Sequence, residues 1–186
     1  MSPWIIALLV VVGIFLLWAV GAYNGLVRSR NHVKNGWSQI DVQLKRRHDL
    51  VPNLVETVKG YAGHEKETLE RVMRARSAAV SAHSPGEASR HEGELSQALG
   101  RLMMVVEQYP NLKADQNFLS LQEELTSTEN KISFSRQYFN DTVMHYNNKI
   151  QSVPTNFIAS IGGFEQEEFF ELENQQERQA PKVSFS

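Results

Sequence analysis

The sequence predicts an all-α protein in which an N-terminal transmembrane helix continues into an up-and-down antiparallel helical bundle. An unbroken apolar run over residues 4–22 indicates the membrane helix. Apolar residues that recur every three or four positions in the later segments indicate amphipathic helices that share a core. Only 6 prolines interrupt the 186 residues, and no segment shows the alternating pattern of a strand. A bundle of four helices is expected, with three long helices as the alternative.

The apolar run, WIIALLVVVGIFLLWAVGA, carries no charged residue, and the first charge after it is Arg28. As a helix these residues would span roughly 28 Å, close to the hydrocarbon thickness of about 30 Å. Trp4 and Trp18 suit the two interfacial belts of a bilayer. A cleaved signal peptide is the alternative, because residues 20–22 would suit cleavage, but the basic segment that opens such signals is missing. The run is therefore interpreted as a single spanning helix.

The charges that flank the run predict its orientation. No charge precedes it, whereas several basic residues follow it, namely Arg28, Arg30, Lys34, Lys45, Arg46 and Arg47. The positive-inside rule then places the N-terminus outside and the C-terminal domain in the cytoplasm. Membrane lipid is a predicted partner, because these cations could contact anionic headgroups; the alternative is that they serve only as topology signals.

Charge and composition exclude some classes of function. The net charge of −2 argues against nucleic acid as the main partner, and the lack of cysteine excludes disulfides, thiolate metal sites and cysteine nucleophiles. The C-terminal segment is acidic, with Glu165, Glu167, Glu168, Glu171, Glu173 and Glu177. We therefore expect an anchor at 1–25, a helical bundle at 26–164 and an acidic, partly disordered tail at 165–186.

The first soluble helix is expected to continue directly from the membrane helix. Its apolar stripe consists of Trp37, Ile40, Leu44, Val51, Val55 and Val58. His48 is the polar position within this stripe, and Pro52 is expected to kink the helix. Gly60 and Gly63 bracket a break, after which the chain either reverses or bends.

A start signal separates the next two helices. The first of them is expected over residues 64–83. Ser84 is expected to cap the second helix, with Pro85 at the first helical position and Glu87 reaching back in a capping box. This helix is expected to end at Pro110, and its apolar stripe consists of Leu95, Leu99, Leu102, Val106 and Tyr109.

The longest soluble helix is predicted from Lys113 or Asp115 to about Ser152. Thr128 and Ser135 interrupt its apolar face, and such small hydroxyls usually bond the carbonyl of the preceding turn. The apolar face consists of Phe118, Leu121, Leu125, Ile132, Phe139, Val143, Tyr146 and Ile150.

Proline and glycine define the end of the helical part. Pro154 stops the long helix, residues 155–161 can add one or two turns, and glycines 162 and 163 free the backbone for a turn. The aromatic residues Phe164, Phe169 and Phe170 are expected to dock the following segment onto the bundle.

The sequence contains no motif for catalysis or metal binding. Residues 64–65 and 91–92 begin like a zinc-protease motif, but Thr68 and Leu95 occupy the place of the second histidine. None of the 6 histidines has an acidic residue three positions before it, which excludes the Glu-x-x-His pairs of a di-iron bundle. A phosphate loop and a serine nucleophile elbow are also absent. The sequence therefore predicts no enzyme, no metal and no cofactor.

Two mixed-charge clusters are the remaining candidates for a site. The first consists of Asp41, Lys45, Arg46, Arg47, Asp49, Asn53 and Glu56, and the second of Glu123, Glu124, Glu129, Asn130, Lys131 and Arg136. Such clusters are usually solvated helix faces, but they can also form a buried network between helices or set the register of an oligomer. Gly21 and Gly25 form a small-xxx-small motif, which lets helices approach closely. The candidate helix–helix or oligomer interface therefore consists of Gly21, Gly25, Trp37, Asp41, Arg46, Arg47, Glu56, Glu129 and Arg136.

Several long motifs resemble the bacterial LemA family. They extend over almost the whole chain and comprise YNGLV at 23–27, RNHV at 30–33, WSQIDVQLKRR at 37–47, DLVPNLVETVKGY at 49–61, YPNLKA at 109–114, ENKI at 129–132 and YFN at 138–140. The resemblance implies a single-pass protein of the bacterial inner membrane, N-terminus outside, with a LemA-like four-helix bundle and no established enzymatic activity. Relatives are often encoded near membrane zinc metallopeptidases, and one branch is associated with membrane remodelling around magnetosomes.

These observations together predict a membrane-anchored, non-enzymatic scaffold. It is expected to self-associate into a homo-oligomer through long, coiled-coil-like helices and to organise or remodel the inner membrane. The alternative is an adaptor that binds a membrane protease or another envelope protein. The adaptor would use a face of the bundle or the acidic segment at 165–177.

Overall fold

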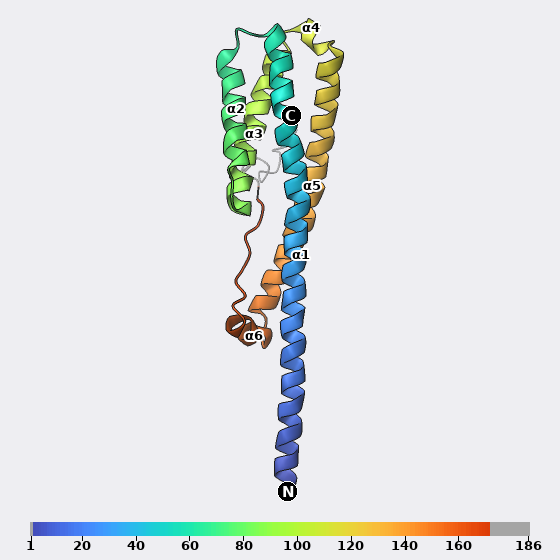
Figure 1. Ribbon diagram of the computed structural model, residues 1–186, viewed down its shortest axis with the longest axis vertical. Coiled ribbons are helices and arrows are strands. Elements are labelled where there is room, and N and C mark those ends of the chain that lie inside the picture. Colours follow the sequence, from blue (N-terminus) through green and yellow to red (C-terminus); the bar gives the residue numbers. More distant parts are fainter. Residues whose placement is uncertain (1, 172–186) are drawn as a thin grey trace, which may run out of the picture. The chain divides into compact units, whose positions relative to one another are not determined.

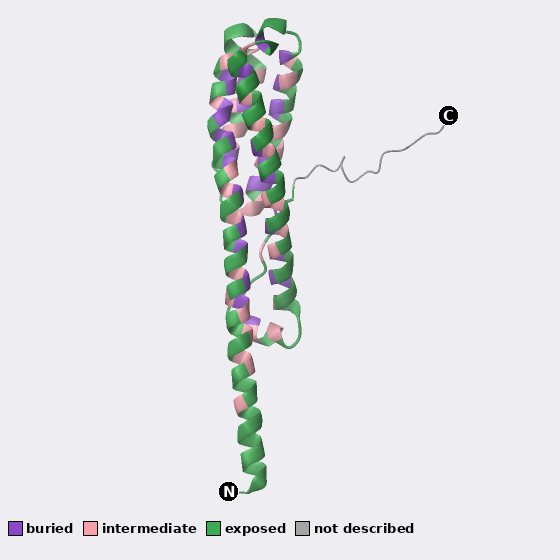
Figure 2. Cartoon of the chain, turned by 90° about the vertical axis from the view of Figure 1, so that its right-hand side faces the viewer, coloured by how far each residue is buried: buried purple, intermediate pink, exposed green. Residues whose placement is uncertain are grey.

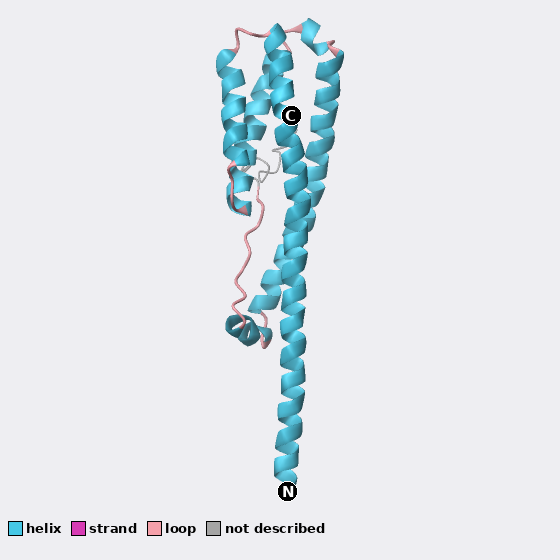
Figure 3. Cartoon of the chain, viewed as in Figure 1, coloured by secondary structure: helices cyan, strands magenta, loops and turns pink. Residues whose placement is uncertain are grey.

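The computed structural model describes residues 2–171, and this part of the chain is helical without strands (Figure 3). The helices are α1 (Pro3–Tyr61), α2 (Lys66–Val80), α3 (Pro85–Val106), α4 (Pro110–Lys113), α5 (Gln116–Gln151) and α6 (Thr155–Ile161). The predicted all-α class is therefore confirmed. Residues 172–186 hold most of the predicted tail, including Glu173 and Glu177, and lie outside the described residues.

The backbone contacts divide the chain into two compact units. Unit 1 consists of Met1–Gln39 and Ser135–Glu168, and unit 2 consists of Ile40–Phe134 and Phe169–Ser186. The long helices α1 and α5 each contribute residues to both units.

In unit 2 the chain reverses direction after α1. The Arg76 side chain of α2 donates to the backbone carbonyl of His48, with 2.6 Å between Nε and the oxygen. Because α2 begins at Lys66, this contact requires α2 to run back along α1. The break that Gly60 and Gly63 bracket is thus a reversal, and unit 2 contains α2 and α3 beside parts of α1 and α5 (Figure 1). This arrangement has four helices rather than three.

The core of unit 2 is built from the apolar stripes of these helices. Its fully buried members, with no exposed side-chain surface, are Val51, Leu54, Val58, Ala62, Val72, Leu95, Leu102 and Leu112. Burying a leucine or valine completely contributes about 1.5–3 kcal/mol, so apolar packing is the main source of stability here. The stripes that the heptad-like spacing predicts therefore do face the core.

The helix boundaries in unit 2 follow local capping. The Ser84 hydroxyl accepts from the backbone N–H of Glu87 at 3.2 Å, as the start signal predicts. The predicted capping box would have the Glu87 carboxylate accept from the N–H of Ser84. It accepts instead from the N–H of the preceding residue, His83, at 3.0 Å. This hydrogen bond holds the pKa of Glu87 below its usual range. The helix ends at Val106, earlier than expected, and the single turn α4 follows.

Asp115 starts the long helix α5 and ties it to the end of α1. Its Oδ1 accepts from the N–H of Phe118 at 3.0 Å, and its Oδ2 accepts from the hydroxyl of Tyr61 at 3.0 Å. These hydrogen bonds lower the pKa of Asp115 and raise the pKa of Tyr61. Farther along α5, the buried hydroxyl of Thr128 donates to the carbonyl of Glu124 at 2.8 Å, as predicted for a hydroxyl within the stripe.

In unit 1, α1 packs against the second half of α5. Phe139 is buried against Gly36, where an added Cβ would lie 3.3 Å from the Cα of Phe139. The rings of Trp37 and Phe139 lie 5.6 Å apart. Leu26 and Tyr146 are also buried, and burial raises the pKa of Tyr146. The close approach at Gly36 therefore sets the distance between the two helices.

The segment after α6 is fixed to unit 1 by two contacts. Gly163 has φ +64°, a left-handed conformation that favours glycine, and it turns the chain as predicted. Phe164 is then buried beside α1. The side chain of Asn147 makes two hydrogen bonds to the backbone of Glu167, at 2.9 Å and 3.0 Å. Of the other aromatic residues expected to dock, Phe170 is buried in the second unit and Phe169 is 39% exposed.

The N-terminal part of α1 is long and apolar enough to cross a membrane. Its best window has a mean hydropathy of 2.9, and none of that window is buried in the protein. Figure 2 shows this part of the helix exposed over nearly its whole length. The finding is compatible with a single-pass membrane protein.

Candidate functional site

A buried ion pair lies between α1 and α3 in unit 2. Nη1 of Arg47 lies 2.9 Å from Oε2 of Glu92, and the two side chains are 6% and 2% exposed. The second guanidinium nitrogen, Nη2, donates to the hydroxyl of Ser96 at 2.8 Å and lies 3.2 Å from Oε2 of Glu129 on α5. Arg47 thus joins three helices through charge-assisted hydrogen bonds.

His48 completes this network from the neighbouring position on α1. Its Nε2 lies 2.5 Å from Oε1 of Glu92, so both oxygens of this carboxylate have partners. The carbonyl of His48 accepts from Arg76 on α2. Four helices therefore meet around two consecutive residues of α1. A buried charge is costly unless it is paired and hydrogen-bonded, and here each charge has its partners.

The remaining members of the first predicted cluster lie at the surface of unit 2. Asp41 pairs with Lys45 at 2.6 Å, and Glu56 pairs with Lys59 at 3.1 Å, both along α1. Arg46 lies 3.7 Å from a carboxylate oxygen of Glu124 on α5, with about half of each side chain exposed. These exposed pairs contribute little stability, in contrast to the buried pair of Arg47.

The predicted interface residues of unit 1 take no part in that network. An added Cβ at Gly21 or Gly25 would meet nothing within 4 Å, so this face of α1 is open in the single chain. Trp37 packs against Phe139, and Arg136 is half-buried. Among the predicted interface residues, the structure thus joins Arg47 to Glu129 within unit 2.

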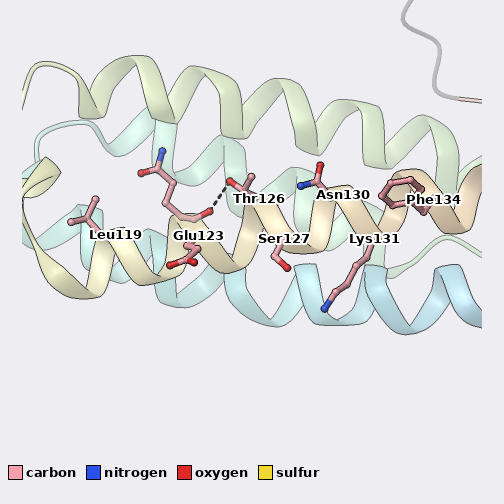
Figure 4. Close-up of a pocket in the computed structure, with 8 residues that line it drawn as sticks. Leu119, Glu123, Thr126, Ser127, Asn130, Lys131 and Phe134 are labelled. Atoms are coloured by element: carbon pink, nitrogen blue, oxygen red, sulfur yellow. Dashed lines mark hydrogen bonds between the residues drawn. The ribbon is translucent and has the colours of Figure 1, made fainter.

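The outer face of α5 in unit 2 is a candidate for association with another molecule. A shallow groove runs along it, lined by eight exposed residues, Leu119, Gln122, Glu123, Thr126, Ser127, Asn130, Lys131 and Phe134. We call these eight residues the α5 outer face. Leu119 and Phe134 at its two ends are 46% and 75% exposed. Figure 4 shows Glu123 on the Leu119 side of Thr126 and Ser127, and Lys131 on the Phe134 side.

The α5 outer face has no internal ion pair. The two opposite charges, Glu123 and Lys131, are eight residues apart and belong to no ion pair within residues 2–171. Thr126 donates to the carbonyl of Gln122 at 2.9 Å, which holds its hydroxyl against the helix (Figure 4). The side chains at the middle of the face, Thr126 and Ser127, are therefore small and lie close to the helix. The side chains at its two ends are apolar.

No group of three or more histidine, aspartate or glutamate side chains is placed to hold a metal ion in the part of the chain that the structure describes. The arrangement around Arg47 is a set of ion pairs and hydrogen bonds among side chains of the bundle itself. This geometry holds α1, α3 and α5 together, with both Arg47 and Glu92 buried.

Comparison with known proteins identifies the family. A family model described as the LemA family matches residues 36–185. The chain belongs to the LemA family. Protein LemA of Metamycoplasma hominis is 30% identical over 159 residues, which cover 83% of this chain and 71% of that protein. The resemblance found in the sequence motifs is thus confirmed.

Magnetosome proteins are also among the relatives. Magnetosome protein MamQ 2 of Paramagnetospirillum magneticum and MamQ of Magnetospirillum gryphiswaldense are each 26% identical to this LemA-family chain. The matches cover 84% of this chain and 67% of each relative. Together with the apolar helix of α1, family membership supports a membrane-associated protein.

Sequence reasoning missed four members of the buried network of this LemA-family chain, namely His48, Arg76, Glu92 and Ser96. Glu92 lies three residues before Leu95 and therefore on the apolar stripe of α3, where a charged residue signals a buried partner. His48 carries the same signal on α1. Arg76 also lies on a stripe, four residues after the buried Val72 of α2, but its partner could not be predicted, because its side chain bonds a backbone carbonyl that every residue possesses.

Proposed function

We propose that this chain is a membrane-anchored, non-enzymatic scaffold that self-associates through the α5 outer face and thereby organises the membrane. In this proposal α1 crosses the bacterial inner membrane with the N-terminus outside, and the rest of the chain lies in the cytoplasm. The observation that carries the proposal is the pattern of side chains along the α5 outer face. Apolar ends, opposite charges and a small centre make this face complementary to itself.

The self-complementarity depends on antiparallel pairing of two copies. If a two-fold axis passes between Thr126 and Ser127, Leu119 of one protomer lies opposite Phe134 of its partner. The same axis places Glu123 of one protomer opposite Asn130 of the other protomer. Lys131 of that protomer is one residue away, about 1.5 Å of helix rise. A two-fold interface uses the same patch on both copies, so each pair of contacts occurs twice.

The composition of the α5 outer face favours such a contact over a solvated surface. Leu119 and Phe134 are 46% and 75% exposed at the two ends of the face, so pairing two copies would remove both side chains from water. The small side chains of Thr126 and Ser127 let two helix backbones approach closely at the centre. Unlike charges at the flanks select the antiparallel register, because the parallel register would bring like charges together.

The test measures the mass of the full chain in mild detergent by light scattering after size-exclusion chromatography. The wild-type protein is expected to form dimers or larger oligomers. Lys131→Glu is expected to weaken association, because it opposes Glu123 with a like charge. The combined variant Glu123→Lys/Lys131→Glu restores the charge pairs and is expected to restore association. Arg74→Glu, an exposed charge change on α2, is the matched control and leaves the mass unchanged.

Two results would contradict the proposal. A wild-type chain that stays monomeric at high concentration would remove its basis and would favour an adaptor for another envelope protein. If Lys131→Glu does not weaken association, the α5 outer face is excluded as the interface. The same conclusion follows if the charge swap does not restore association. Clustering of vesicles that carry the protein, measured by dynamic light scattering, shows whether paired copies join one membrane or two.

A further inference from the structure

An uncharged, apolar surface lies at α6 and the turn before it in unit 1. No aspartate, glutamate, lysine or arginine lies between Lys149 and Glu165. Within this segment Val153, Phe157 and Ile161 are 76%, 62% and 86% exposed. Phe157 and Ile161 lie four residues apart and therefore share one face of α6. Several exposed apolar side chains that lie close together, with no charged residue among them, are typical of a docking surface.

Contacts within unit 1 fix the level of α6 along α1. The last turns of α5 reach α1 at Ser29, whose hydroxyl accepts from Nζ of Lys149 at 2.6 Å. After α6, the ring of Phe164 packs edge-on against Tyr23, with 5.4 Å between the ring centroids. The guanidinium of Arg30 lies 5.0 Å from the centre of the same ring. Both connections to α6 therefore meet α1 between Tyr23 and Arg30, and α6 lies beside this part of α1 (Figures 1 and 2).

This part of α1 is where the candidate membrane span ends. The uncharged apolar run ends at Ala22, directly before Tyr23. Ser29 lies seven residues further, about 10 Å along the helix axis. The headgroup region on each side of the hydrocarbon is roughly 5–8 Å thick. If α1 spans the bilayer, the apolar face of α6 therefore lies at the level of the headgroups rather than in bulk water.

The polar surroundings in unit 1 also suit a phosphate headgroup layer. A groove between α1 and α5 is lined by Ser29, His32, Tyr138, Thr142, His145, Asn148, Lys149 and Ser152. These side chains supply hydroxyl, imidazole, amide and ammonium donors, and none of them is a carboxylate. Arg28 and Arg30 are further cations on this part of α1. Cations beside an interfacial apolar face are the usual composition of a surface that binds anionic lipid.

We propose that α6 is a second membrane contact, in which Val153, Phe157 and Ile161 enter the interfacial layer of the leaflet from which α1 emerges. The partner is the surface of a bilayer that contains anionic lipid. This contact fixes unit 1 at two points, so that α1 cannot rotate freely about its axis. The proposal rests on α1 crossing the membrane, as in the proposed function, but it does not depend on self-association.

The absence of cysteine from the chain allows a site-specific test. Single variants Phe157→Cys and Ile161→Cys are labelled with an environment-sensitive fluorophore, and the full chain is reconstituted in vesicles of phosphatidylcholine and phosphatidylglycerol. Met104→Cys on α3, where Met104 is 65% exposed, is the matched control for an exposed apolar site. Leu16→Cys reports on the span itself. Quenching by lipids that carry a spin label near the headgroup or deeper in the acyl chain is then measured.

We expect labels at 157 and 161 to shift to the blue and to be quenched most strongly by the shallow spin label. The label at 16 is expected to be quenched by the deep one, and the label at 104 by neither. Quenching at 16 without quenching at 157 and 161 would overturn this proposal and leave the membrane anchor intact. Loss of quenching at 16 would overturn both. A blue shift at 157 that disappears when protein is diluted in lipid would show that another copy, rather than lipid, covers α6.

Phe157→Asp/Ile161→Asp gives a second, independent readout. Both side chains are exposed, so the thermal unfolding of the full chain in detergent is expected to stay unchanged. In vesicles, Ser160→Cys carrying the fluorophore is expected to lose its blue shift when this pair of substitutions is added. A blue shift that persists with both aspartates in place would contradict insertion of this face.

Discussion

Arg47 and Glu92 form an ion pair in the interior of unit 2, with 2.9 Å between Nη1 and Oε2 and almost no exposed surface on either side chain. The pair joins α1 to α3, and its partners on α2 and α5 extend the network to four helices. Buried ion pairs of this kind add less net stability than apolar packing would. We infer that the pair fixes which faces of the helices meet.

The first prediction concerns the loss of one partner of this ion pair. Glu92→Gln leaves Arg47 with only the half-exposed Glu129 as a charged partner, and this is expected to lower the free energy of unfolding by about 3 kcal/mol. Glu70→Gln breaks an exposed pair with Arg74 and is expected to cost less than about 0.5 kcal/mol. Thermal and urea unfolding of the full chain in detergent, followed by circular dichroism, measures both.

The double variant Arg47→Met/Glu92→Met distinguishes the ion pair from its separate charges. It removes both charges together and is expected to recover most of the stability that Glu92→Gln loses. Equal losses in Glu92→Gln and in the exposed control would contradict the buried network.

The second prediction concerns the closest approach of two helices in unit 1. Gly36→Leu places its Cβ 3.3 Å from the Cα of Phe139 and 3.3 Å from Oγ1 of Thr142, so the helices must separate. We expect the free energy of unfolding to fall by about 1–3 kcal/mol because of this overpacking.

Gly100→Leu on α3 is the matched control, because an added Cβ there meets nothing within 4 Å. It is expected to stabilise the protein by about 0.5–1 kcal/mol through helix propensity. Similar thermal shifts in both variants would argue against the close contact.

The sequence predicted those parts of the fold that depend on local patterns. Apolar spacing predicted the helices, and the Ser84 cap and the Gly163 turn were confirmed because each depends on a few neighbouring residues. The sequence left open whether the chain reverses at 60–63, because the answer depends on the distant contact between Arg76 and His48. The single turn α4 was not expected, because Pro110 reads equally as an end and as a first helical position.

The candidate sites were harder to predict, because burial distinguishes residues that look alike in sequence. Arg46 and Arg47 are consecutive and chemically identical, yet Arg46 lies at the surface and Arg47 is buried. The exposed apolar residues of α6 belong to a pattern that also fits a packed helix. Only the structure shows that Phe157 and Ile161 face outward.

The third prediction concerns the two hydrogen bonds that hold the segment after α6. Asn147→Ala removes both the Nδ2 donor to the carbonyl of Glu167 and the Oδ1 acceptor of its N–H. The amide of Glu167 is expected to exchange its hydrogen about tenfold faster, because it loses its hydrogen-bond acceptor. Asn148→Ala, at the exposed neighbouring position, is the control and should leave this exchange rate unchanged. Equal exchange in both variants would show that other contacts hold the segment.

The last prediction is a pH dependence that follows from Asp115. Hydrogen bonds from Phe118 N–H and Tyr61 hold the pKa of this carboxyl below its ordinary value of 3.8 in the folded chain. A carboxyl with a lowered folded pKa stabilises the protein fully above its unfolded pKa and loses this contribution as the pH falls through the folded pKa.

The variant Asp115→Asn tests this dependence, because its side chain can still cap a helix but lacks the charge. At neutral pH it is therefore expected to melt at a lower temperature than the wild type, and the two melting temperatures converge as the pH falls below the ordinary pKa of an aspartate. Melting curves of both proteins across this range measure the effect, with Tyr61→Phe expected to show a smaller difference that follows the same trend. A difference that stays constant down to the acid limit would mean that the charge of Asp115 does not contribute.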